Sequence, residues 1–163
     1  LREPDALGHA VRERAAARVP PVAPLDLRED ALGRDLRVGD VVLLYGGLGA
    51  GKTLLTKGVM NALDFDIDEV TSPSFSLVNL YNTPAFDVYH IDLWRLDAAH
   101  RPADAVGLDD ILEHPNAVTL IEWADRLGET ALPAPTIVVR IAGDGDDPRT
   151  ITIEDRSRGE NLT

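Results

Sequence analysis

The chain of 163 residues contains no cysteine, and this absence excludes disulfide bonds and thiolate metal sites. Its apolar runs reach only about five residues, far short of the roughly twenty that a membrane-spanning helix needs. The start of the sequence also lacks the basic-then-apolar pattern of a signal peptide. We therefore expect a soluble cytoplasmic protein with no membrane-spanning segment.

Basic residues are scarce as well. Sixteen Lys and Arg residues stand against 28 Asp and Glu residues, which gives a net charge of −12. Long-range repulsion from a phosphate backbone then argues against autonomous binding to DNA or RNA. An acidic surface more often serves solubility than a specific basic partner, so we draw no partner from the charge alone.

The length and the hydrophobic content of 44% are enough for one buried core and too little for two ordinary domains. We expect a peripheral segment over residues 1–25 and a single domain over 26–163. Leu7, Val11 and Ala15 lie at helical spacing, which predicts a helix within residues 1–18 that ends before Pro20-Pro21.

One motif stands out in this lysine-poor chain. It follows an apolar stretch of strand character, Val41 to Tyr45, and it fits the G-x-x-x-x-G-K-[ST] pattern of the phosphate-binding P-loop. Its residues are Gly46-Gly47-Leu48-Gly49-Ala50-Gly51-Lys52-Thr53. A glycine-rich turn with no ligand is the alternative, and the order of strand, loop and helix argues against it.

The chemistry of such a loop explains its residue types. The glycines let the backbone approach phosphate oxygens with its N–H groups, and Lys52 places a positive charge near the terminal phosphates. Thr53 offers a hydroxyl to Mg²⁺, while a helix expected from Thr53 to about Leu63 directs its positive dipole end toward the anion. Nucleotide binding is therefore the leading interpretation.

The rest of the chain predicts an α/β fold of the P-loop NTPase type, with a mixed β-sheet in three layers flanked by helices. A short helix is expected near residues 30–36, and a polar, helix-compatible region spans about 97–114. Strand-like segments follow the P-loop helix. The first two of them read as an antiparallel hairpin, and the last two, joined by a turn at 143–148, read as another. These segments are 75–81, 86–92, 117–121, 136–141 and 150–153.

A P-loop needs an acidic partner at the end of a neighbouring strand, because Mg²⁺ and an attacking water are held beside the terminal phosphate. Asp92 and Glu122 each end a predicted strand, and the sequence does not choose between them. A strand-end cap or a salt bridge is the structural alternative for each. Ser74 lies in Thr71-Ser72-Pro73-Ser74-Phe75, which is either a phosphate-sensing switch segment or a turn that opens a strand.

Two further residues and one missing motif also bear on the function. Arg95 is expected in a surface salt bridge more often than on a phosphate, and His90 alternates with buried positions and is interpreted as structural. The Asn-Lys-x-Asp element expected of a guanine-specific GTPase does not occur in the chain.

Taken together, these motifs resemble the TsaE family, small ATPases of bacterial tRNA threonylcarbamoyladenosine biosynthesis. The similarity lies in the order and spacing of several blocks and covers about residues 30–127. The blocks are Gly39-Asp40-Val41-Val42 leading into Leu48 to Thr53, then Thr71 to Phe75 with Leu77-Val78-Asn79, His90-Ile91-Asp92-Leu93-Trp94-Arg95-Leu96 and Ile121-Glu122-Trp123-Ala124.

The resemblance implies binding of ATP or ADP with Mg²⁺, and hydrolysis that depends on assembly with the partners TsaD and TsaB. The tRNA is then contacted only indirectly, through the complex. It also implies that residues 46–53 bind the phosphates and that Thr53 and Glu122 form the metal-binding pair. By the same resemblance, Asp92 is the acid needed for ATP turnover, Ser74 supplies the switch hydroxyl, and Trp123 lines the nucleotide site.

The chain departs from the family pattern at three positions. The family usually has Thr where Ser74 stands, and it often has acidic residues where Gly47 and Leu80 stand. Two other functions also remain open. A small-molecule kinase could clamp a phosphoryl group with Arg95, Arg101 and Arg126, and a non-catalytic module could sense the bound nucleotide through its switch segment.

Overall fold

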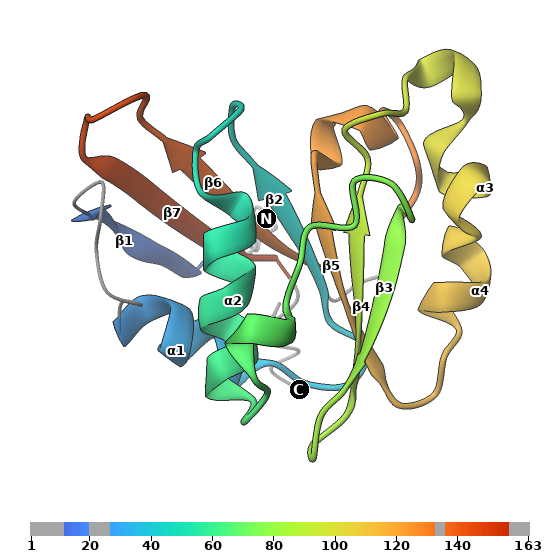
Figure 1. The fold of residues 1–163 in the computed structure, drawn as a ribbon, viewed down its shortest axis with the longest axis horizontal. Helices are drawn as coiled ribbons and strands as arrows, with labels where there is room; N and C mark the ends of the chain where they lie inside the picture. The colour runs from blue at the N-terminus through green and yellow to red at the C-terminus, as the bar shows by residue number, and fades with distance from the viewer. Residues whose placement is uncertain (1–11, 20–26, 133–135, 157–163) are drawn as a thin grey trace, which may run out of the picture.

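A mixed β-sheet with parallel strands at its centre organises the fold (Figure 1). The computed structural model of the chain describes residues 12–19, 27–132 and 136–156. Within them, the sheet has seven strands in the order β1-β7-β6-β2-β5-β4-β3. The strands are β1 (Arg12–Val19), β2 (Val41–Tyr45), β3 (Val78–Asn82), β4 (Asp87–Asp92), β5 (Ala117–Glu122), β6 (Thr136–Ala142) and β7 (Arg149–Asp155).

The helical elements are short, apart from the helix that follows the P-loop. They are α1 (Leu27–Asp35), α2 (Lys52–Ala62), η1 (Ile67–Glu69), η2 (Ala98–His100), α3 (Pro102–Val106), α4 (Leu108–Leu112) and η3 (Ala124–Leu127). None of the helices in the described part of the chain is both long and apolar enough to cross a membrane.

Strand β2 shows why the centre of the sheet is parallel and fully covered. It pairs in parallel with β5 on one side and β6 on the other. Val42 and Leu44 belong to one hydrophobic core, whereas Val41 and Leu43 belong to the other. Since both faces of the strand are buried, its sequence is a continuous apolar run rather than an alternating one.

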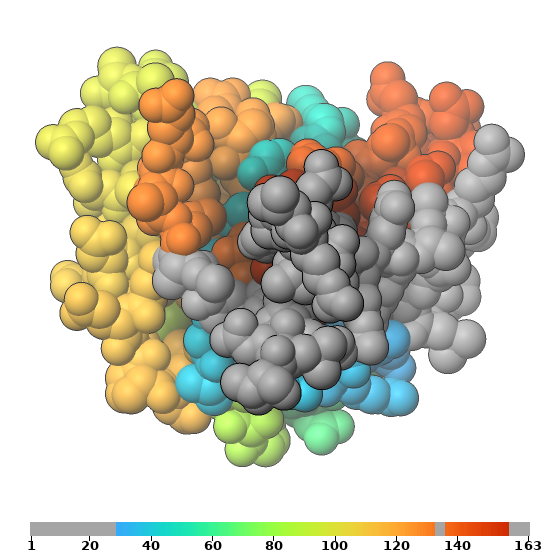
Figure 2. Space-filling model, turned by 180° about the vertical axis from the view of Figure 1, so that it is seen from behind, coloured from blue at the N-terminus to red at the C-terminus, as the bar shows by residue number. Residues whose placement is uncertain are grey.

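Helices cover the two faces of the sheet and give the fold three layers. On one face, α1 and α2 pack together and contribute Leu32, Val59 and Met60 to the core. On the opposite face, Leu108 and Ile111 of α4 lie in the second core. Seen from behind, α3 and α4 form one side of the molecule, and the end of the β6–β7 hairpin forms the other (Figure 2). The predicted mixed three-layer fold is confirmed.

The pairing of β4 with β5 and of β5 with β2 is parallel throughout. The carboxyl ends of these three strands therefore meet at one edge of the sheet, where ligands bind in open α/β folds. The loop between β2 and α2 lies at that same edge (Figure 1). The two acids that end β4 and β5 are thus brought toward the P-loop.

Most predicted elements are confirmed, and one is wrong. The hairpins β3–β4 and β6–β7 are antiparallel as expected, although the first strand starts at Val78 rather than Phe75. The helix predicted within residues 1–18 is wrong for residues 12–18, because they belong to the edge strand β1, which pairs antiparallel with β7. The remainder of that prediction lies outside the described residues, and the division into 1–25 and 26–163 stays a prediction.

Candidate functional site

The loop of residues 46–51 joins β2 to α2 and needs glycine at specific points. Gly49 and Gly51 have φ angles of 72° and 108°, a left-handed region that other residues rarely adopt. A Cβ atom at Gly46 would lie 3.0 Å from the carbonyl oxygen of Ile141. Gly47, by contrast, has open space around it, so a larger residue fits there.

Lys52 begins α2 and turns back over the loop. Its Nζ donates to the carbonyl oxygens of Gly46 and Gly47 at 2.6 and 2.8 Å, and it lies 3.8 Å from the ring centroid of Trp123. Burial lowers the pKa of Lys52, while the charges of Glu122 and Asp92 oppose this shift. The ammonium group is therefore a poorly hydrated cation held at the mouth of the loop.

Glu122 connects the P-loop helix to the neighbouring strands. Thr53 Oγ1 donates to the two carboxylate oxygens of Glu122 at 3.0 and 3.2 Å. On its other side, Glu122 Oε1 lies 2.7 Å from His90 Nε2. Glu122 and His90 are both buried, and an ionised carboxylate only accepts hydrogen bonds. The ring nitrogen of His90 therefore donates, and it holds Glu122 toward Thr53.

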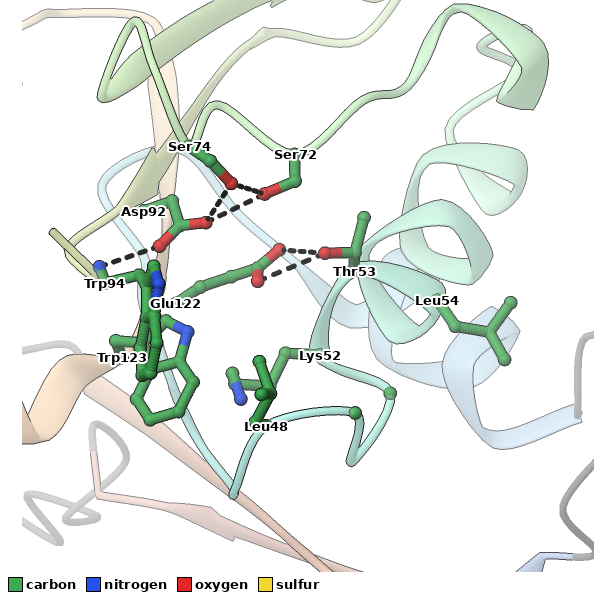
Figure 3. Close-up of a pocket in the computed structure, with 12 residues that line it drawn as sticks. Leu48, Lys52, Thr53, Leu54, Ser72, Ser74, Asp92, Trp94, Glu122 and Trp123 are labelled. Atoms are coloured by element: carbon green, nitrogen blue, oxygen red, sulfur yellow. Dashed lines mark hydrogen bonds between the residues drawn. The ribbon is translucent and has the colours of Figure 1, made fainter. Parts of the chain in front are cut away.

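Asp92 is satisfied by different partners. Its Oδ2 accepts from Ser72 Oγ at 2.8 Å and from Ser74 Oγ at 3.3 Å, and the two hydroxyls lie 2.9 Å apart. Its Oδ1 accepts from the backbone N–H of Trp94 at 2.8 Å. Asp92 thus faces the 71–75 segment, while Glu122 faces Thr53, so the two acids occupy distinct positions (Figure 3).

These groups line a single cleft of about 340 Å³ at the carboxyl edge of the sheet (Figure 3). Trp94 and Trp123 form one wall, with ring centroids 4.4 Å apart. Trp123 follows Glu122 directly and has a φ angle of 56°, an uncommon conformation for a large residue that recurs at functional sites. Glycine residues of the loop, a cation, two acids and three hydroxyls therefore surround one space beside two aromatic rings.

The donor set suits Mg²⁺ that arrives with a phosphate ligand. Within the described ranges, no three His, Asp or Glu side chains are grouped to hold a metal by themselves. Mg²⁺ is commonly bound by one or two protein oxygens together with substrate phosphates and waters. Thr53 and Glu122, whose oxygens lie 3.0 Å apart, fit that partial set.

Comparison with known proteins agrees with this geometry. Residues 26–151 match the family model described as threonylcarbamoyl adenosine biosynthesis protein TsaE. The chain belongs to the TsaE family. The tRNA threonylcarbamoyladenosine biosynthesis protein TsaE of Bacillus subtilis is 36% identical over 77% of this chain and 82% of its own length. The Mycobacterium leprae protein of the same name is 44% identical over 60% of this chain and 64% of its own length.

A solved structure shows the same fold. The crystal structure of Bacillus subtilis YdiB superposes with a TM-score of 0.64 at 30% sequence identity, and the match covers 90% of this chain and 88% of that one. The resemblance found in the motif blocks is thereby confirmed at the level of family and fold.

The family motifs come together at the cleft, whereas the candidate arginines do not. Arg95 stacks over the ring of Phe75 at 4.1 Å, which is neither the salt bridge nor the phosphate contact expected for it. Arg101 pairs with Asp104 at 2.7 Å. Arg126 donates to the carbonyl oxygen of Leu96, and its guanidinium lies 5.5 and 5.9 Å from the ring centroids of Trp94 and Trp123 in the wall of the cleft. None of the three arginines is among the described residues that line the cleft.

Sequence reasoning missed several neighbours of the predicted residues. Ser72 was read only as part of the segment that contains Ser74, yet it makes the shorter bond to Asp92. Trp94 lies two residues beyond Asp92 and lines the cleft, but it is not among the predicted site residues. His90 was interpreted as structural, and its complete burial agrees, but its bond to Glu122 was not foreseen. Only the proximity of Ser72 and Trp94 to selected residues could have pointed to them.

Proposed function

We propose that this chain is a Mg²⁺-dependent ATPase that serves tRNA N6-threonylcarbamoyladenosine modification together with TsaD and TsaB partners. The observation that carries the proposal is the bond of Thr53 to Glu122, which joins the P-loop helix to an acid at the end of the adjacent parallel strand. Membership of the TsaE family supports the role in tRNA threonylcarbamoyladenosine biosynthesis, and the residues of the cleft support ATP binding and hydrolysis.

Each group in the cleft has a distinct task in this proposal. The N–H groups of loop 46–51 and the Lys52 ammonium bind the phosphates of ATP or ADP, and Trp123 lines the nucleotide site. Thr53 and Glu122 hold Mg²⁺, which screens the charge of the phosphates when bound. Asp92, with Ser72 and Ser74 on one oxygen, orients the attacking water and accepts its proton.

The proposed dependence on partners rests on the surface around the cleft. Leu48, Phe75 and Trp94 are 75%, 85% and 40% exposed. Leu48 and Trp94 line the cleft, and Phe75 follows Ser74 in the chain. Exposed large apolar residues around a site mark contact with another protein. The net charge of −12 disfavours direct contact of this chain with tRNA, which supports a division of labour in which the partners make that contact.

Phosphate release tests the proposal directly. The chain is measured alone and with purified TsaD and TsaB, with ATP, in the presence and absence of Mg²⁺. We expect little release from the chain alone, a rise on addition of both partners, and loss of the signal without Mg²⁺ or in the Lys52→Ala variant. Absence of any rise together with absence of complex formation contradicts the proposal.

The same assay addresses the two other functions. A kinase would transfer phosphate to a small acceptor without partners, but Arg95, Arg101 and Arg126 lie apart in three separate contacts, and no observation favours this function. A non-catalytic sensor would support tRNA modification without hydrolysis. Asp92→Asn separates that possibility, because unchanged modification with abolished phosphate release would favour sensing over turnover.

A further inference from the structure

Arg149, at the start of β7, reaches the P-loop from nearly a hundred residues further along the chain. Its Nε donates to the carbonyl oxygen of Ala50 at 3.2 Å, and its Nη2 donates to that of Gly49 at 3.3 Å. The loop follows β2, and β6 separates β2 from β7 in the sheet. The arginine therefore spans the end of a whole strand to contact the loop.

The same guanidinium also fixes the turn between β6 and β7. Its Nη1 donates to the carbonyl oxygen of Asp147 at 2.6 Å, and its Nη2 donates to that of Gly145 at 3.0 Å. A Cβ atom at Gly143 would lie 3.1 Å from Arg149 Cδ, so the turn closes tightly around the arginine stem. One side chain thus ties two loops together through four main-chain carbonyl groups.

The direction of these bonds determines how the P-loop presents its N–H groups. A peptide unit is planar and trans, so its carbonyl oxygen and its N–H point in opposite directions. Arg149 draws the carbonyl of Ala50 to itself, and the N–H of Gly51 in the same peptide unit is therefore directed away from Arg149. Gly51 lines the cleft, where a phosphate-binding loop uses its N–H groups.

Carbonyl oxygens are the partners of this guanidinium throughout. Among the described residues, all four of its hydrogen bonds go to carbonyl oxygens and none goes to a carboxylate. Its positive charge lies beside the loop, where Asp144, Asp146 and Asp147 of the same turn counter its long-range field. Arginine, unlike lysine, presents several donors in a rigid fork, which is what simultaneous contact with four carbonyls needs.

We propose that Arg149 is a positioning residue for nucleotide binding: it fixes the carbonyl groups of Gly49 and Ala50 so that the N–H of Gly51 is set for phosphate. The inference rests on the proposed nucleotide-binding function, and it adds a residue of β7 outside every motif block. Arg149 does not itself line the cleft, so it acts through the loop and not on the nucleotide.

Calorimetric titration of Mg-ADP into the full chain tests this inference. Arg149→Met removes the hydrogen bonds that the charged guanidinium makes to the loop, so it should weaken Mg-ADP binding about tenfold or more. Arg149→Lys keeps the charge but loses the fork, and it should also weaken binding. The matched control is Arg156→Met, because Arg156 lies just beyond the opposite end of β7 and pairs with Glu154; it should bind as the unmodified chain does.

Two results of the titration would overturn the inference. If Arg149→Met binds Mg-ADP as tightly as the Arg156→Met control, Arg149 does not act on the loop. If Arg149→Lys binds like the unmodified chain, charge alone matters and positioning does not. A different result would contradict the proposed function itself. If the unmodified chain binds no nucleotide, the proposed function is wrong, and the result does not depend on Arg149.

Amide hydrogen exchange gives a readout that needs no turnover and, in the free chain, no ligand. In the free chain, Arg149→Lys should speed exchange in peptides that cover residues 46–51 and 143–148, while Arg156→Met leaves both unchanged. In the unmodified chain, Mg-ADP should slow exchange in 143–148 as well as in 46–51, because stabilisation of one loop is transmitted to the other. Unchanged exchange in both experiments refutes the inference even if Arg149→Met fails to fold.

Discussion

The Nε2 atom of His90 lies 2.7 Å from Oε1 of Glu122, and both side chains are almost completely buried. The two residues come from adjacent parallel strands, β4 and β5. Glu122 in turn accepts from Thr53. The histidine therefore orients an acid that the proposed function assigns to Mg²⁺, in the way that outer-shell partners fix metal ligands.

Removal of the His90 donor should affect stability and Mg²⁺ together. His90→Leu leaves the buried carboxylate of Glu122 with Thr53 as its remaining side-chain donor, and we expect the free energy of unfolding to fall by about 3 kcal/mol. Binding of ADP should lose most of its dependence on Mg²⁺. His90→Gln keeps an N–H donor and should retain more of both properties. Urea unfolding and Mg²⁺ titrations of ADP affinity measure the two effects.

His114→Leu is the control for this experiment, because His114 is a partly exposed histidine 3.8 Å from Asp87. It should change neither quantity appreciably. The interpretation of His90 is wrong if His90→Leu and His90→Gln show the same Mg²⁺ dependence as the unmodified chain.

Glu122 and Asp92 should fail in different ways when their charges are removed. Glu122→Gln should weaken Mg-ADP binding about tenfold, because its charge faces Thr53 and the proposed metal position. Asp92→Asn should leave binding nearly intact and lower partner-stimulated phosphate release about a hundredfold, the lower end of the range for a general base. Binding titrations and phosphate release separate these effects.

Asp87→Asn provides the matched control, because Asp87 lies at the opposite end of β4 and accepts from Asn82. Equal losses of binding in Glu122→Gln and Asp92→Asn would show that the two acids share one role, contrary to their separate partners in the structure.

Ser72 should matter at least as much as Ser74. Its hydroxyl lies 2.8 Å from Asp92 Oδ2, compared with 3.3 Å for Ser74. A hydrogen bond to a charged group contributes enough that Ser72→Ala should lower phosphate release about tenfold, with a smaller loss for Ser74→Ala. Ser74→Thr keeps the hydroxyl and should remain active.

The control for these serine variants is Ser76→Ala, since the Ser76 hydroxyl bonds to Asn79 and not to Asp92. A larger loss in Ser74→Ala than in Ser72→Ala would contradict the ranking of the two hydroxyls by their distance from Asp92.

Local patterns predicted the P-loop, its flanking elements and the two hairpins because each depends on residues that are close in sequence. The apolar run of β2 and the glycines after it are sufficient to place Lys52 and Thr53. The same reasoning failed at residues 12–18, where helical spacing of Val11 and Ala15 was misleading. Pairing with β7, more than a hundred residues away, determines that segment, and tertiary contacts of this kind override local propensity.

The site was predicted as a set of residue types but not as a set of contacts. By residue type and position alone, Asp92 and Glu122 are equivalent because each ends a strand, and only the family resemblance implies different roles for them. Only the parallel order β2-β5-β4 shows that Glu122 is next to the P-loop strand, whereas Asp92 lies one strand further away. Arg149 could not be found at all, because nothing in its local sequence indicates a contact with Ala50.

Lys52 should reduce the stability of the free chain while it enables phosphate binding. Burial lowers its pKa below 10.5, so the unfolded chain binds more protons than the folded chain as pH approaches that value. Stability therefore rises with pH in the interval between the folded pKa and 10.5. Lys52→Met removes both the desolvated charge and this rise, and it should abolish Mg-ADP binding without lowering the melting temperature at neutral pH. Lys57→Met changes the only other lysine of the chain. It is the control and should retain Mg-ADP binding.

A clear fall in the melting temperature of Lys52→Met would contradict this prediction. It would show that the hydrogen bonds of Lys52 to Gly46 and Gly47 stabilise the chain by more than burial of the charge destabilises it.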